Sequence, residues 1–200
     1  MPELAKQPQH KPAWRDHRLL QYLLLAGLLL PTVVSAGDNA FVIKSVQTEL
    51  HQGVYQLDAR IDYRFSEEAL SALTNGVPLL IIMDIEVVQQ RNWWFNKDLA
   101  ELEQGYLLIY HALSEQFIIN NLNSGTQENY SSLGAALNTL GYIEHLPLID
   151  SKLLTKDANY LVRIRTRLDI ESLPAPMRPL AYISSDWQLD SAWVSWPLTK

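Results

Sequence analysis

The sequence predicts a mainly β protein, an antiparallel β-sandwich of immunoglobulin-like architecture with two short helical insertions. Most of its apolar segments alternate apolar and polar residues with a period of two, as half-buried antiparallel strands do. Successive segments are joined by connections too short for parallel crossovers. Only two stretches carry the capping residues and the single apolar stripe of a helix. The alternative is an α+β fold with helices on one face of an antiparallel sheet.

The first predicted hairpin joins residues 41–50 to residues 54–65 across a turn at residues 51–53. In the second of these strands the alternation has no fault. Apolar and aromatic side chains therefore share one face, and charged or amide side chains share the other. The inward set is Tyr55, Leu57, Ala59, Ile61, Tyr63 and Phe65.

Two short helices are predicted, over residues 66–76 and 131–141. Ser66 can cap the first helix, and the two glutamates that follow it suit the positive end of the helix dipole. Ser131 or Ser132 can cap the second helix. Each helix has one apolar stripe, which predicts that one face of each is buried.

The remaining predicted strands bring the total to about seven. They cover residues 77–95, 105–113, 116–122, 159–170 and 187–198. The inward residues of the two most regular strands are Leu79, Ile81, Met83, Ile85 and Val87, and then Tyr160, Val162, Ile164, Thr166, Leu168 and Ile170. A proline-punctuated stretch, residues 171–182, is interpreted as a connection that leads into the last strand.

Tryptophans near strand ends are candidates for partner binding. If the strand over residues 77–95 is unbroken, Trp93 points inward and Trp94 points outward, whereas a bulge would exchange the two. In the last strand, Trp187 and Trp193 fall on one face, which we interpret as core, and Trp196 falls on the other. Outward tryptophans are typical of binding hot spots, so Trp94 and Trp196 are candidates. The alternative is that other elements cover both.

A row of outward arginines, Arg163, Arg165 and Arg167, is the second candidate for partner binding. Guanidinium groups bind phosphate and carboxylate ligands well. The sequence also supplies outward acids at the same strand spacing, which favours the simpler interpretation that the arginines form cross-strand ion pairs. The acids considered are Asp58, Asp62, Asp84 and Glu86.

The sequence carries no recognisable catalytic or metal-binding motif. The absence of cysteine excludes disulfides, thiolate catalysis and cysteine-bound metals. The glycine-rich phosphate loop, the nucleophile elbow and the paired-histidine zinc motif are also absent. His111 and Glu115 have the spacing of a helical metal pair, but the local pattern is a hairpin. We therefore predict neither enzymatic activity nor a cofactor nor a metal.

The charge balance excludes further classes of partner. The chain has 16 basic and 22 acidic residues, and its net charge is −6. Binding to nucleic acid or to an anionic membrane surface through bulk charge is therefore not expected.

Residues 1–36 have the composition of a secretory signal peptide. Basic residues precede a short apolar run, and small residues follow it, with Ala36 in the cleavage position. The run is shorter than the roughly 20 apolar residues of a spanning helix, and Pro31 interrupts it. We predict cleavage after Ala36 and a single β-rich periplasmic domain over residues 37–200. The alternative is an uncleaved segment that anchors the protein in the inner membrane, which would be its one contact with the bilayer.

Four stretches, EEALSALTNGVPLLI, YHALSEQFIIN, AALNTLG and RLDIESLPAPMRPLAYISSDWQLDSAW, occur in this order. Together they resemble the bacterial domain of unknown function 4390 family, and the resemblance covers nearly all of residues 40–198. It implies an exported proteobacterial protein whose gene often lies beside those of a membrane sensor kinase and its regulator. It implies no catalytic residue.

These observations favour a non-enzymatic periplasmic interaction module whose partner is a membrane sensor or another envelope protein. One alternative is a carrier for a small ligand or lipid, with an apolar cavity between the sheets. It is motivated by residues 105–113, which are apolar on both faces. A further alternative is an envelope hydrolase that uses His111 or His145.

Overall fold

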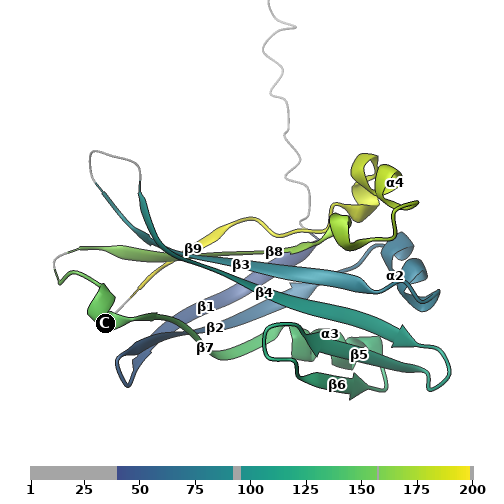
Figure 1. Cartoon of the computed structure of the whole chain (residues 1–200), viewed down its shortest axis with the longest axis horizontal. Coiled ribbons are helices and arrows are strands. Elements are labelled where there is room, and N and C mark those ends of the chain that lie inside the picture. Colours follow the sequence, from purple (N-terminus) through teal and green to yellow (C-terminus); the bar gives the residue numbers. More distant parts are fainter. Residues whose placement is uncertain (1–39, 92–95, 157, 199–200) are drawn as a thin grey trace, which may run out of the picture. The chain divides into compact units, whose positions relative to one another are not determined.

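Two antiparallel β-sheets form the body of the chain (Figure 1). The computed structural model describes residues 40–91, 96–156 and 158–198. One sheet has the strand order β1-β2-β7 and the other has the order β6-β5-β4-β3-β8-β9. The strands are β1 (Phe41–His51), β2 (Val54–Tyr63), β3 (Leu79–Gln89), β4 (Lys97–His111), β5 (Gln116–Asn121), β6 (Gln127–Tyr130), β7 (Tyr142–Asp150), β8 (Tyr160–Leu168) and β9 (Val194–Pro197). The predicted class, a mainly β antiparallel sandwich, is confirmed, although both sheets are open.

The helices of the described residues are short. They are α2 (Glu67–Thr74), α3 (Leu133–Leu140) and α4 (Arg178–Ile183), with single 3-10 turns η2 (Ser151–Leu153), η3 (Ile170–Ser172) and η4 (Ser185–Trp187). The two predicted helices are α2 and α3. Ser66 Oγ accepts the Ala69 N–H and Ser132 Oγ accepts the Ala135 N–H, so each serine satisfies a backbone donor that the first turn leaves free.

Helix α4 was not predicted, and the interpretation of residues 171–182 as a plain connection is wrong. Its N-cap residue, Met177, makes no capping hydrogen bond through its side chain, so the usual start signal is missing. Pro179 lies in the first turn, where the lack of an N–H does no harm. A proline that the sequence pattern marks as a breaker therefore begins a helix here.

The first hairpin forms as predicted. His51 pairs with Val54, and the two residues between them, Gln52 and Gly53, both have positive φ angles, 50° and 85°. Positive φ at both turn positions is typical of the type I′ turn, whose twist matches that of the paired strands. The turn thereby sets the register of β1 on β2.

The core lies between the two sheets and includes the predicted inward residues of β2, β3 and β8. The alternation is observed directly, because the residues at every second position of these strands are buried. Thr166 is the polar exception on β8. Its hydroxyl lies 3.3 Å from the Tyr63 hydroxyl, and its N–H donates to Ser191 Oγ at 3.0 Å. Burial raises the pKa of Tyr63 far above its ordinary value.

Strands β6 and β7 and the first half of β4 were not predicted from the sequence. In β7 the pairing with β2 shifts register twice, and His145 has a φ of 54°. The irregular backbone breaks the period of two on which strand prediction depends. Pro147 also argues against a strand, but β7 is an edge strand, where proline is tolerated.

Candidate functional site

The outer face of the larger sheet carries the predicted arginine row. Alternation along β8 turns Arg163, Arg165 and Arg167 away from the core. In the neighbouring strand β3, Asp84 lies opposite Arg165 and Glu86 lies opposite Arg163. Opposite residues in an antiparallel pair have side chains on the same face, so acids and arginines meet across the strands.

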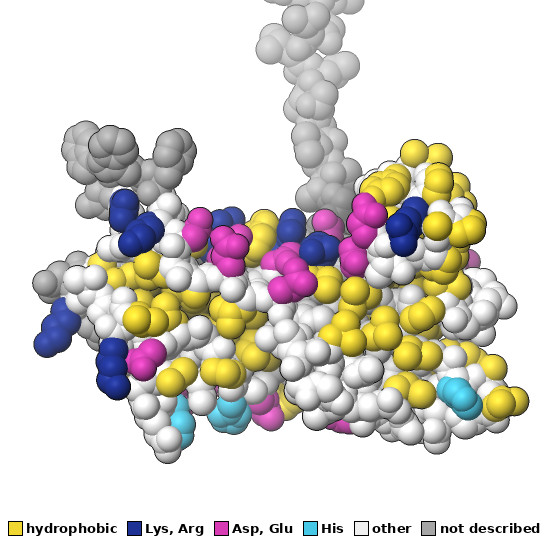
Figure 2. All heavy atoms as spheres, viewed as in Figure 1, with side chains coloured by type: hydrophobic (Ala, Val, Ile, Leu, Met, Phe, Trp, Pro, Cys, Tyr) yellow, Lys and Arg dark blue, Asp and Glu magenta, His cyan; other side chains and the backbone are white. Residues whose placement is uncertain are grey.

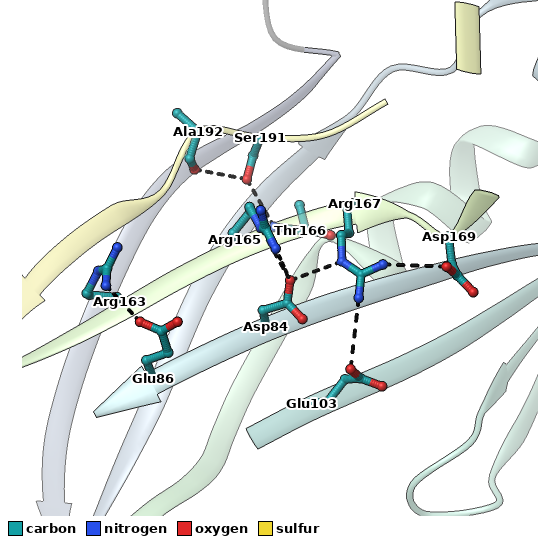
Figure 3. A network of polar contacts seen from close by, with 10 residues as sticks. All are labelled: Asp84, Glu86, Glu103, Arg163, Arg165, Thr166, Arg167, Asp169, Ser191 and Ala192. Atoms are coloured by element: carbon teal, nitrogen blue, oxygen red, sulfur yellow. Dashed lines mark hydrogen bonds and ion pairs between the residues drawn. The ribbon is translucent and has the colours of Figure 1, made fainter. Parts of the chain in front are cut away.

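These side chains form ion pairs across the strands, in two separate groups (Figure 3). Arg163 Nη1 lies 2.8 Å from Glu86 Oε2, and Arg165 Nη2 lies 2.8 Å from Asp84 Oδ2. Arg167 Nε lies 3.1 Å from the same Asp84 oxygen. The other two contacts of Arg167 are at 3.5 Å to Asp169 and 3.9 Å to Glu103. The favoured interpretation, cross-strand pairing with Asp84 and Glu86, is confirmed.

The other two acids considered, Asp58 and Asp62, do not pair with the arginine row, because they belong to β2 in the smaller sheet. Asp62 lies 3.7 Å from Lys44 Nζ, and Asp58 Oδ1 accepts the His145 N–H at 2.7 Å. Sequence spacing placed them on outward faces but could not say which strands would be neighbours.

Trp193 lies on the same outer face as the arginine row, so its predicted inward orientation is wrong. The guanidinium carbons of Arg163 and Arg165 each lie 4.8 Å from the centre of its ring, within the range of cation–π contacts. The prediction assumed one strand over residues 187–198, whereas η4 ends at Trp187 and β9 begins only at Val194. Alternation therefore does not carry over from Trp187, which is buried as predicted.

The two tryptophans proposed for partner binding differ in what the structure describes. Trp196 lies opposite the fully buried Val162 in the pairing of β8 with β9, so its side chain is on the inward face of the larger sheet and its predicted outward orientation is wrong. Because β9 is an edge strand, 41% of the Trp196 surface is nevertheless exposed. It stays a candidate. Trp93 and Trp94 lie outside the described residues, so their orientation stays a prediction.

The arginine row is poorly suited to capture a free anion. Its three guanidinium groups contact four carboxylates, those of Asp84, Glu86, Glu103 and Asp169, which leaves a net charge of −1. A phosphate or carboxylate ligand would have to compete with a carboxylate already bound at each arginine. The adjoining hollow, about 410 Å³, is lined by four acids, Asp84, Glu86, Glu101 and Glu103, and by one arginine, Arg165. The arrangement is a set of ion pairs that connects β3, β4 and β8.

A second hollow, about 260 Å³, opens between the β4–β5–β6 part of the larger sheet and the α3–β7 segment. Three tyrosines line it, Tyr106, Tyr130 and Tyr142, together with Glu128 and Glu144. The Tyr130 hydroxyl donates to the Glu128 carboxylate, and burial raises the pKa of Tyr106. The hollow is more polar than the apolar cavity that a lipid carrier would need.

The histidines considered for metal or catalysis are not grouped with other ligands. His111 ends β4, and its Nδ1 lies 2.9 Å from Ser114 Oγ in the hairpin turn. Within residues 40–91, 96–156 and 158–198, no three His, Asp or Glu side chains are placed to hold a metal ion.

Three exposed large apolar side chains lie on α4, the helix that the sequence interpretation missed. We define the α4 patch as Leu180, Tyr182 and Ile183, which are 62%, 52% and 81% exposed. Ala181 between them is fully buried and holds the helix on the core. Figure 2 shows apolar side chains gathered over this end of the molecule. The run of four apolar residues could have signalled the patch, because so short a helix cannot bury its whole circumference.

A groove runs beside the α4 patch, between α2 and α4. We define the α2–α4 groove by its apolar lining, Ala72, Val77, Met177, Leu180 and Trp187, and by Glu67, Glu68, Ser71 and Asn75 along its α2 side. Its volume is about 590 Å³. Both helices lie at the same end of the molecule (Figure 1), and η4 packs against each of them.

Comparison with known proteins gives one match. The family model described as "Domain of unknown function (DUF4390)" matches residues 38–197. No curated protein and no solved structure matches the chain. In the part of the chain that the structure describes, no helix has the length and apolar character needed to cross a membrane.

Proposed function

The chain belongs to the DUF4390 family, and we propose that it is an exported, non-enzymatic interaction module of the bacterial cell envelope. In this proposal the signal peptide, residues 1–36, directs export, and the domain over residues 37–200 works in the periplasm. The support for export is the sequence of basic residues, apolar run and small residues at the N-terminus. If that segment is not removed, it holds the domain at the inner membrane.

The observation that carries the proposal is the α4 patch. Three large apolar side chains in one short helix are exposed, while the residues around them, Ala181 and Leu173, are fully buried. Contiguous exposed apolar surface is typical of contact sites, because its removal from water by a partner lowers the free energy of the complex. Aromatic residues such as Tyr182 are also enriched at such sites.

The partner class proposed is a membrane sensor kinase or another envelope protein. The sensor is proposed because the family resemblance implies gene neighbours of that kind. The acidic charge of the chain, −6 overall, supports a protein partner over nucleic acid or an anionic lipid surface.

Photo-crosslinking in living cells tests the proposal. A photoreactive residue at position 183, in the α4 patch, should capture a specific envelope protein. The same residue at position 113 is the matched control, because Leu113 is 95% exposed in the β4–β5 turn and belongs to no apolar patch defined here. Position 94 is a second test site. Equal capture from positions 183 and 113, or none from 183 and 94 in folded protein, would refute the proposal.

A small-ligand carrier is the second candidate, favoured by the tyrosine-lined hollow of about 260 Å³. This volume lies just below the range of about 300–1,000 Å³ that is usual for ligand pockets. Native mass spectrometry of gently purified protein should then show a co-purified small molecule that is lost when Tyr106 is changed to alanine. Protein of unmodified mass throughout would count against the carrier.

A further inference from the structure

We propose that the α2–α4 groove binds an apolar segment of the partner protein, with a lysine or arginine of that segment beside Glu67 and Glu68. This inference rests on the proposed function and names the surface and the chemistry of its partner. The occupant is a protein segment with an apolar face and a basic flank.

The floor of the groove is apolar and continuous with the α4 patch. Leu180 belongs to both, and Met177 and Trp187 extend the apolar surface toward α2. Ala72 and Val77 close it on the α2 side. A segment that lies in the groove can therefore cover the exposed surface of Leu180 and reach Tyr182 and Ile183, which gives association its hydrophobic driving force.

The rim of the groove is acidic on one side. Glu67 and Glu68 are exposed in the first turn of α2, and neither makes an ion pair with another described residue. No lysine or arginine is among the lining residues. Arg178, the basic residue of α4, donates through Nε to the Leu173 carbonyl at 2.7 Å. The rim thus presents two carboxylates to which a basic side chain of a partner is complementary.

The groove is held in shape before any partner arrives. Ser66 Oγ donates to the Asp186 carbonyl at 2.7 Å and also accepts the Ala69 N–H, so one side chain joins the start of α2 to η4. Buried Leu73 and Ala181 fix the two helices on the core. A preformed site loses less conformational entropy on binding than one that must first be ordered.

Charge favours this occupant over a second copy of the chain or a lipid surface. A second copy would bring a net charge of −6 toward the acidic rim, and an anionic bilayer would be repelled by the same carboxylates. A basic-flanked apolar segment satisfies both the floor and the rim.

Two synthetic probes test the inference. The first is an amphipathic peptide of about 15 residues, long enough to form a helix, with leucines on one face and lysines elsewhere. The second has glutamate in place of every lysine. Fluorescence anisotropy with the purified protein should show tighter binding of the leucine–lysine probe. Leu180→Ser should weaken that binding by about tenfold or more, because it removes a leucine side chain that the probe would bury.

The rim is tested by a double variant, Glu67→Gln with Glu68→Gln. It should weaken the leucine–lysine probe by about fivefold, as expected for two rim ion pairs, and leave the leucine–glutamate probe unaffected or bound more tightly. The matched control is Glu49→Gln with Glu101→Gln, which removes the same charge from two exposed strand residues outside the groove. Leu180→Ser and the control double variant should unfold as the unaltered protein does, since each altered side chain is mostly exposed. Glu67→Gln with Glu68→Gln should unfold slightly earlier, because these two carboxylates also interact favourably with the dipole of α2.

Several outcomes would overturn the inference. Two concern the probes: neither probe binds, or the two glutamine double variants lose the same amount of binding. Two concern other occupants: the protein is a dimer that Leu180→Ser dissociates, or it floats with phosphatidylcholine vesicles and Leu180→Ser abolishes that flotation. The proposed function fails separately. If crosslinking from position 183 captures an envelope protein and that capture is unchanged by Leu180→Ser and by Glu67→Gln with Glu68→Gln, the interaction module stands and the assignment of the groove is wrong.

Discussion

Replacement of Gly141 by alanine should destabilise the protein, because a Cβ at this position would lie 2.0 Å from the carbonyl oxygen of Ile61. The optimum separation of non-bonded heavy atoms is about 3.5 Å, so one backbone must move by roughly 1.5 Å. The same two residues share a hydrogen bond, from the Ile61 N–H to the Gly141 carbonyl, at 2.8 Å. A shift of either strand end therefore also weakens this bond.

The magnitude follows from three contributions. Overpacking costs about 1–3 kcal/mol, and a strained backbone hydrogen bond costs about 1 kcal/mol. The smaller entropy of the unfolded alanine chain returns about 0.4–1 kcal/mol. The expected net loss is about 1–3.5 kcal/mol. In urea denaturation, with an m-value of about 2 kcal/mol per molar, the midpoint should fall by about 0.5–2 M.

Gly134 is the matched control, because it lies in the adjacent helix α3 and a Cβ there would meet no atom within 4 Å. Gly134→Ala should stabilise the protein by about 0.5–1 kcal/mol, as alanine does in a helix. Opposite signs for the two substitutions are the expected result. If Gly141→Ala unfolds at the same urea concentration as the unaltered protein, the close approach of the α3–β7 junction to β2 is not rigid and the reasoning is wrong.

Three further predictions concern polar contacts. Thr166→Val should cost about 1–3 kcal/mol in urea denaturation, because it leaves the buried Tyr63 hydroxyl without its partner; a double variant that also carries Tyr63→Phe should recover part of this loss. Stability should fall as pH rises above about 10, because Tyr63 ionises in the unfolded chain while its raised pKa keeps it neutral in the folded one; Tyr63→Phe should flatten this dependence, and an unchanged slope would contradict it. Asp84→Asn should cost about 1 kcal/mol at low salt and less in 1 M salt, since two partly exposed arginine pairs are lost; a salt-independent loss would exclude this electrostatic origin.

Local pattern was sufficient wherever an element's own residues decide its structure. The alternation of β2 and β8 predicted which of their side chains enter the core, because successive side chains of any strand point to opposite faces. In β3 the predicted inward residues are buried too, but Ile82 and Val88 on its other face are buried as well. The capping serines of α2 and α3 could be predicted for a similar reason, since each serine and the N–H that it accepts are only three residues apart.

Local pattern failed where distant contacts override it. Strand β7 is held by backbone pairing with β2 despite two register shifts, and Asp58 of β2 accepts the N–H of the strained His145. Trp193 turns outward because the last strand begins only at Val194, so alternation does not set its side, and two arginines of β8 contact its ring. None of these partners is near in sequence, so no window of the sequence contains the information.

The candidate sites divide in the same way. The sequence by itself determined that the arginines point outward from their own strand and that several acids point outward from theirs, since both follow from a period of two. Only the tertiary structure decided that Asp84 and Glu86, and not Asp58 and Asp62, lie beside that row, because strand order is a non-local property. It also decided that α2 and α4 lie close enough to form a groove and that Leu180, Tyr182 and Ile183 stay exposed. The exposure of a side chain depends on which other residues pack against it. For α4, elements distant in the sequence determine which of its side chains are covered.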